Sequence, residues 1–138
     1  MRNLDLAHDY LKRARVRVGA LEVLYEGESW ADVVRESQEV VELALKALLR
    51  ASGVDVPRVH DVAPILHAER ARLPGSLAPF VDELADASRQ LRRDRELAFY
   101  GAEDLTPGEF YTQADADRAL ASARRVVELV SQHLPGTF

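Results

Sequence analysis

Apolar residues recur at helical spacing along nearly the whole chain. Between residues 4 and 25 they are spaced alternately three and four apart, which places them on one stripe of a helix. The stripe consists of Leu4, Ala7, Leu11, Ala14, Val18, Leu21 and Tyr25. No alternating apolar and polar pattern is long enough to indicate a strand. We therefore expect an all-α chain without a sheet, beginning with a helix over about 4–25.

The second apolar stretch predicts a helix that is covered on more than one side. Ser29, with Asp32 three residues later, approximates a capping box at its start. Gly53 supplies a stop just after Ala51. Apolar residues also lie outside the main stripe, namely Val40, Leu43 and Ala47. We expect this helix to be the central element of the fold.

Capping and breaking residues predict three further helices, over about 61–72, 77–100 and 112–134. Asp61 is expected as the N-cap of the first of them, with Pro64 in its first turn. Thr112 and Asp115 form a capping signature for the last. Because the connections are short, we expect an antiparallel up-and-down bundle of about five helices in a single domain, residues 1–138.

The composition excludes several classes of protein and site. The chain has no cysteine, which excludes disulfides, a thiol nucleophile and zinc held by thiolates. Its formal charge of −5 argues against nucleic-acid binding through overall charge, so an RNA contact would need a local patch. His60 and His67 are seven residues apart with no third ligand nearby, and we expect no metal and no cofactor. A charged N-terminal helix and the lack of a long apolar run predict a cytoplasmic protein.

Polar residues on inward faces are the candidates for function. Arg95 lies within about 20° of the centre of the apolar face of the fourth helix, Arg92 lies on its flank, and Arg89 points away. In the second helix, Ser37 lies within the apolar stripe, with Gln38 and Glu42 beside it. Either the two helices line a shared polar cleft, or Arg95 forms a structural ion pair with an acid such as Glu42.

Three segments resemble, in order, the HEPN domain family: "SQEVVELALKALL" from Ser37, "HDV" from His60 and "RRDRELAFYG" from Arg92. The resemblance extends over nearly the whole chain. It implies an antiparallel helical bundle, usually a homodimer, often encoded beside a minimal nucleotidyltransferase. It also implies that relatives include metal-independent ribonucleases, some of them toxins of toxin–antitoxin pairs.

The family signature is an arginine followed, after four to six residues, by a histidine. Arg95 matches the arginine, which would contact phosphate, but Tyr100 stands where the histidine is expected. A tyrosine, with an ordinary pKa of about 10, is a poor base at neutral pH. Tyr100 could still donate a hydrogen bond or act as an acid.

Three functions remain open from the sequence. The first is a homodimeric binding module whose cleft holds a nucleotide or RNA phosphate, or docks a nucleotidyltransferase. Its candidate site comprises Arg95 and Tyr100, with Arg92, Ser37, Gln38 and Glu42 as lining residues. The second is a metal-independent endoribonuclease, the toxin of a toxin–antitoxin pair. The third is a purely structural interaction protein.

Overall fold

The structure, a computed structural model, describes residues 4–100 and 110–134, with side chains described for 4–92 and 110–134. These residues form five α-helices and two 3₁₀ segments, and none of them lies in a strand. The α-helices are α1 (Leu4–Glu26), α2 (Trp30–Ala51), α3 (Ala63–Ala68), α4 (Val81–Tyr100) and α6 (Gln113–His133). The 3₁₀ segments are η1 (Arg70–Arg72) and η2 (Gly75–Phe80).

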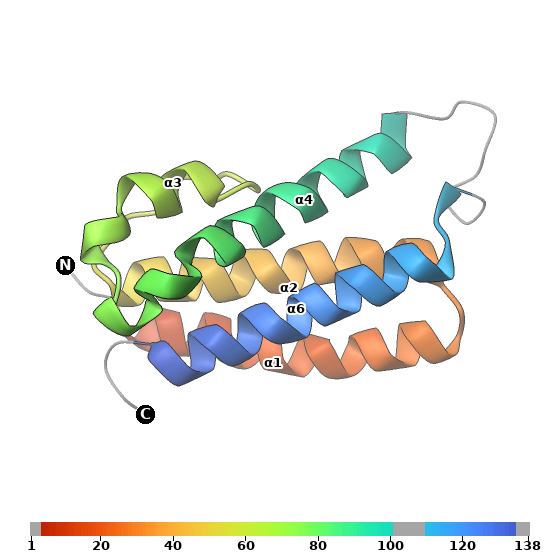
Figure 1. Cartoon of the computed structure of the whole chain (residues 1–138). Coiled ribbons are helices and arrows are strands. Elements are labelled where there is room, and N and C mark those ends of the chain that lie inside the picture. Colours follow the sequence, from red (N-terminus) through yellow and green to blue (C-terminus); the bar gives the residue numbers. More distant parts are fainter. Residues whose placement is uncertain (1–3, 101–109, 135–138) are drawn as a thin grey trace.

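The four long helices α1, α2, α4 and α6 run alternately in opposite directions, while the short α3 packs on α4 (Figure 1). This confirms the expected all-α antiparallel bundle. In the described part of the chain, no helix combines the length and the apolar character needed to cross a lipid bilayer.

Helix α2 is the central element, as its apolar pattern predicts. It packs against α1, α4 and α6. Its fully buried leucines are Leu45, Leu48 and Leu49, and the off-stripe residues Val40 and Ala47 are buried as well. Two polar residues of the same helix, Ser37 and Gln38, are also buried.

Two predicted helix boundaries are wrong. The third helix does not continue to residue 72, because α3 ends at Ala68 and η1 follows as a separate 3₁₀ turn. The α-helical part of the fourth helix begins at Val81, four residues later than expected, since Gly75–Phe80 is 3₁₀. Pro79 lies inside that segment. A proline disfavours the α conformation at the residue before it, here Ala78, so regular α-helix begins only after this pair.

The predicted caps have different outcomes. At α6 the capping box is confirmed, since Thr112 Oγ1 accepts a bond from the Asp115 backbone N–H and Asp115 Oδ2 accepts one from the Thr112 N–H. At α2 the capping box is wrong. The Ser29 hydroxyl donates to Asp32 Oδ2 at 2.6 Å and forms no bond to the helix backbone. A hydroxyl can donate or accept, and here the charged acceptor three residues later is the stronger partner.

Gly53 ends α2 in the left-handed conformation, with φ 80°. The Gly53 N–H bonds the Arg50 carbonyl and the Val54 N–H bonds the Leu49 carbonyl, the pattern of a Schellman motif. We expect Gly53→Ala to lower the free energy of unfolding by about 1–2 kcal/mol, because a Cβ is strained at positive φ.

Gly19 provides the matched control, because it lies inside α1 with no atom within 4 Å of an added Cβ. Gly19→Ala should raise the free energy of unfolding by about 0.5–1 kcal/mol. Urea denaturation measures both variants. Opposite signs are expected, and equal effects would contradict the assigned role of Gly53.

Candidate functional site

A polar layer interrupts the apolar interior where α2 faces the segment that leads into α3. On α2 it is built from Gln38, Glu42 and Lys46, which are spaced four residues apart and therefore lie along one face of the helix. The side chains of Glu42 and Lys46 are only 12% and 19% exposed. A polar layer at this depth needs internal partners, because unpaired buried charges are costly.

The carboxylate of Glu42 is the centre of this layer. Its Oε2 accepts a hydrogen bond from Lys46 Nζ at 3.1 Å. Its Oε1 accepts one from Gln38 Nε2 at 3.1 Å and lies 2.8 Å from His60 Nδ1. Both oxygens of Glu42 are therefore engaged by residues of α2 and by a histidine 18 positions away in the chain.

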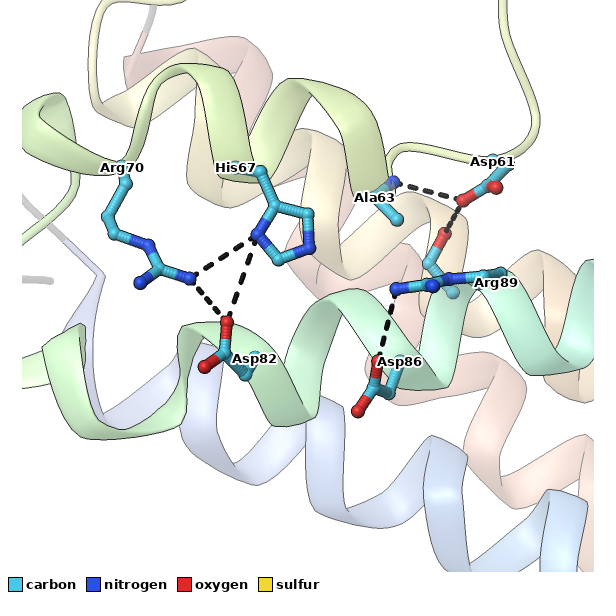
Figure 2. Close-up of polar contacts among 8 residues, drawn as sticks. Asp61, Ala63, His67, Arg70, Asp82, Asp86 and Arg89 are labelled. Atoms are coloured by element: carbon cyan, nitrogen blue, oxygen red, sulfur yellow. Dashed lines mark hydrogen bonds and ion pairs between the residues drawn. The ribbon is translucent and has the colours of Figure 1, made fainter.

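Asp61, the residue after His60, attaches this segment to α4 through a hydrogen bond with Ser88. Asp61 Oδ1 accepts hydrogen bonds from the Ala63 backbone N–H at 3.0 Å and from Ser88 Oγ at 3.1 Å, and Figure 2 shows Asp61 and Ala63 beside α4. Ser88 Oγ in turn accepts from the Val62 N–H at 3.0 Å. The cap residue of α3 is Val62, so the prediction of Asp61 as N-cap is wrong by one position. Asp61 Oδ1 nevertheless accepts a hydrogen bond from the first N–H of the helix, that of Ala63.

Helix α4 extends from this attachment toward the candidate arginines. Ser88 and Leu91 are buried and Arg92 is half-buried, so the inward stripe reaches this point. At 1.5 Å per residue, Arg92 lies about 6 Å and Arg95 about 10 Å along the axis from Ser88. Arg95 and Tyr100 belong to the α4 backbone. Their side chains lie outside the described residues, so their roles stay predictions.

The other predicted site residues lie on α2. Ser37 is fully buried, and its hydroxyl has no hydrogen-bond partner among the described residues. Because α2 and α4 are antiparallel, the direction from Glu42 to Ser37 is also the direction from Ser88 to Arg95 (Figure 1). Ser37 therefore lies toward the end of the bundle that Arg92 and Arg95 approach.

Arg89 is an ordinary surface residue, as expected. Its guanidinium is 58% exposed and bonds Asp86 Oδ1 at 3.1 Å within the same helix (Figure 2). Nearby, Asp82 joins Arg70 and His67 at the start of α4 (Figure 2). These exposed pairs contribute little to stability. The described residues contain no group of three or more metal-ligating side chains that could hold an ion.

An open groove between α4 and α6, with a volume of about 540 Å³, was not predicted from the sequence. Its charged side chains largely pair with one another, Arg125 with Glu83 at 2.9 Å and Arg89 with Asp86 at 3.1 Å. The groove depends on how two helices far apart in the chain pack, which periodicity does not reveal. Because these arginines already have carboxylate partners, the groove is a weak candidate for an anionic ligand.

The pairing of His60 with Glu42 was not predicted from the sequence, in which His60 is considered as a metal ligand and as part of the "HDV" segment. The available signal was the spacing of Gln38, Glu42 and Lys46 on one helix face, which predicts a polar row that needs a partner from another element.

Comparison with known proteins agrees with this architecture. A protein of Methanocaldococcus jannaschii named "Putative toxin MJ1304" is 27% identical over 138 residues, which cover 96% of this chain and 90% of that protein. The crystal structure of ST0689, an archaeal HEPN homologue, has a TM-score of 0.64 and 22% identity, covering 93% of this chain and 97% of that one. Residues 7–133 match the HEPN domain. The chain therefore belongs to the HEPN domain family.

Proposed function

We propose that the chain forms a homodimer whose cleft binds the phosphate of a nucleotide or of RNA. Arg95 would contact the phosphate and Tyr100 would donate a hydrogen bond beside it. The lining residues would be Arg92, Ser37, Gln38 and Glu42. The homodimer, and a minimal nucleotidyltransferase as a protein that docks on it, follow from the family resemblance.

The observation that carries this proposal is the set of partners that Glu42 already has. Glu42 is the acid that the sequence offers as a structural ion-pair partner of Arg95. Glu42 instead pairs with Lys46 and is hydrogen-bonded by Gln38, with His60 at 2.8 Å. Glu42 thus does not need an arginine for its own charge. This argues against Glu42 as the structural partner of Arg95, and we propose an external anion in that place.

The position of the arginines supports the same conclusion. The formal charge of the chain is −5, so attraction to phosphate must come from a local patch. The segment 92–95 carries three arginines in four positions, one turn beyond the attachment of Asp61 to Ser88. Guanidinium groups bind phosphate through paired hydrogen bonds, which suits a site of this kind.

A ligand pair that differs only in the phosphate tests the proposal. We expect adenosine monophosphate or a short RNA to bind at least about tenfold more tightly than adenosine, because a hydrogen bond to a charged group contributes about 1.5–3 kcal/mol. Isothermal titration measures the affinities, and light scattering measures the mass. Equal affinity for adenosine and its monophosphate would refute phosphate recognition, and a monomeric mass would refute the shared cleft.

A metal-independent endoribonuclease is the second candidate function. It is favoured by the 27% identity to the Methanocaldococcus jannaschii protein named "Putative toxin MJ1304". It predicts that the purified chain cleaves RNA in the presence of EDTA and leaves cyclic-phosphate ends. The lack of cleavage at high protein concentration would leave the binding module as the better account.

A further inference from the structure

The side chain of His60 combines an accessible imidazole with a sheltered carboxylate. His60 is 56% exposed, whereas its partner Glu42 is only 12% exposed. Nδ1 of His60 lies 2.8 Å from Glu42 Oε1. Among the described residues, no partner occupies the second ring nitrogen, Nε2. The imidazole is thus held at one nitrogen and open at the other.

The partners of Glu42 determine which nitrogen of His60 carries the hydrogen. A carboxylate paired with Lys46 is ionised and can only accept hydrogen bonds. Nδ1 therefore carries the hydrogen and donates it to Oε1. Neutral imidazole has one N–H, so Nε2 carries the lone pair. This is the arrangement in which a carboxylate orients an imidazole for proton transfer.

His60 also lies beside the segment that leads to the candidate arginines. Its neighbour Asp61 is bonded to Ser88, and Arg92 and Arg95 lie about 6 and 10 Å farther along α4. Both arginines thus lie within about two helical turns of Ser88, the residue to which the segment of His60 is bonded. One RNA segment could contact Arg95 through a phosphate and His60 through a ribose.

We propose that His60 is the proton-transfer group of the cleft and acts on the 2′-hydroxyl of bound RNA. Nε2 takes the 2′-hydroxyl proton while the 2′ oxygen forms a bond to phosphorus. The bond from phosphorus to the 5′ oxygen breaks, and that oxygen takes a proton from water. The imidazolium then returns its proton to the hydroxide, so no oxidant, reductant or co-reactant is consumed. The products are a 2′,3′-cyclic phosphate and a free 5′-hydroxyl.

This proposal rests on the proposed function, because it needs RNA phosphate in the cleft. It goes further by giving the chain a base that the Arg95–Tyr100 pair does not provide. Glu42 lines the cleft and is a positioning residue for this step, since it acts on the proton transfer through His60.

Cleavage and binding are measured separately on the full chain in EDTA. A short single-stranded RNA reports the cleavage rate at saturation, and its 2′-O-methyl analogue, which lacks the nucleophile, reports affinity. For His60→Ala we expect a rate at least about 100-fold lower, with affinity for the analogue within about twofold. Added imidazole should restore part of that rate, which a purely structural role of His60 would not allow.

Three further variants complete the experiment. Arg58→Ala, two residues before His60 and exposed, should cleave at the wild-type rate. His60→Gln, which keeps a polar side chain, should be as inactive as His60→Ala. Glu42→Gln should lower the cleavage rate at saturation by about tenfold, because the imidazole loses its ionised acceptor.

The possible failures can be told apart. Wild-type protein that binds the analogue but leaves RNA intact would overturn the proton transfer and spare the proposed function. Wild-type protein that binds no RNA and no nucleotide would overturn both. Full cleavage by His60→Ala, or a loss of cleavage that imidazole does not restore and that accompanies a lower melting temperature, would assign His60 to structure instead.

Discussion

Replacing Leu45 with alanine is expected to lower the free energy of unfolding by about 2–5 kcal/mol. Leu45 is completely buried in α2, the helix that packs against α1, α4 and α6. Removing its side chain atoms loses the transfer free energy of those atoms and leaves a cavity that three packed helices can close only in part. Urea denaturation with a linear extrapolation measures the change.

Leu43→Ala is the matched control, because it makes the same chemical change in the same helix at a residue that is only partly buried. Its expected loss is about 1 kcal/mol, since less apolar surface leaves the core and solvent fills the space. Equal losses for the two variants would contradict the central position of α2.

The helices and the central role of α2 could be predicted because burial imposes a period on the sequence. Residues such as Val40 and Ala47 lie outside the main stripe of α2, and a helix with apolar residues on several sides must be covered on several sides. The apolar pattern indicates that several sides of α2 are covered without indicating which helix covers each side, and the structure agrees with it.

The details at helix ends could not be predicted in the same way, because they depend on which of several local partners a group selects. Ser29 is of the right type for a cap, yet its hydroxyl donates to Asp32. Asp61 accepts a hydrogen bond from the Ala63 N–H, but it lies one position before Val62, the cap residue of α3. Pro79 lies in the turn that precedes α4, and that turn is a 3₁₀ helix instead of the expected α-helix.

For the candidate site, periodicity predicts which polar residues of α2 turn inward but not what they meet. Ser37 and Gln38 are buried and Glu42 nearly so, in agreement with their positions on the helical wheel. The contact between Glu42 and His60 joins residues 18 positions apart through a loop without a period. Such a contact follows from the path of the loop, which the sequence pattern does not specify.

Replacing Arg95 with alanine is expected to weaken binding of RNA or of a nucleoside monophosphate by about 10- to 100-fold. A guanidinium bound to phosphate forms charge-assisted hydrogen bonds, each contributing about 1.5–3 kcal/mol. If Arg95 faces the cleft, its loss removes these bonds directly. The melting temperature should change little, because Glu42 keeps its own partners Lys46, Gln38 and His60.

Arg89→Ala is the control for charge, because it removes one arginine from the same helix. Arg89 is exposed and already paired with Asp86 within α4. Its loss lowers the overall positive charge by the same amount as the loss of Arg95. Affinity for the ligand should stay within about twofold of the wild type.

The measurement that tests the central claim most directly is the ratio of ligand affinities of these two variants, titrated with the same short RNA at one salt concentration. A ratio of at least about tenfold in favour of Arg89→Ala is predicted, because Arg95 is the one of the two arginines that we propose for the cleft. Equal affinities for Arg95→Ala and Arg89→Ala would contradict the account and remove Arg95 from the binding site.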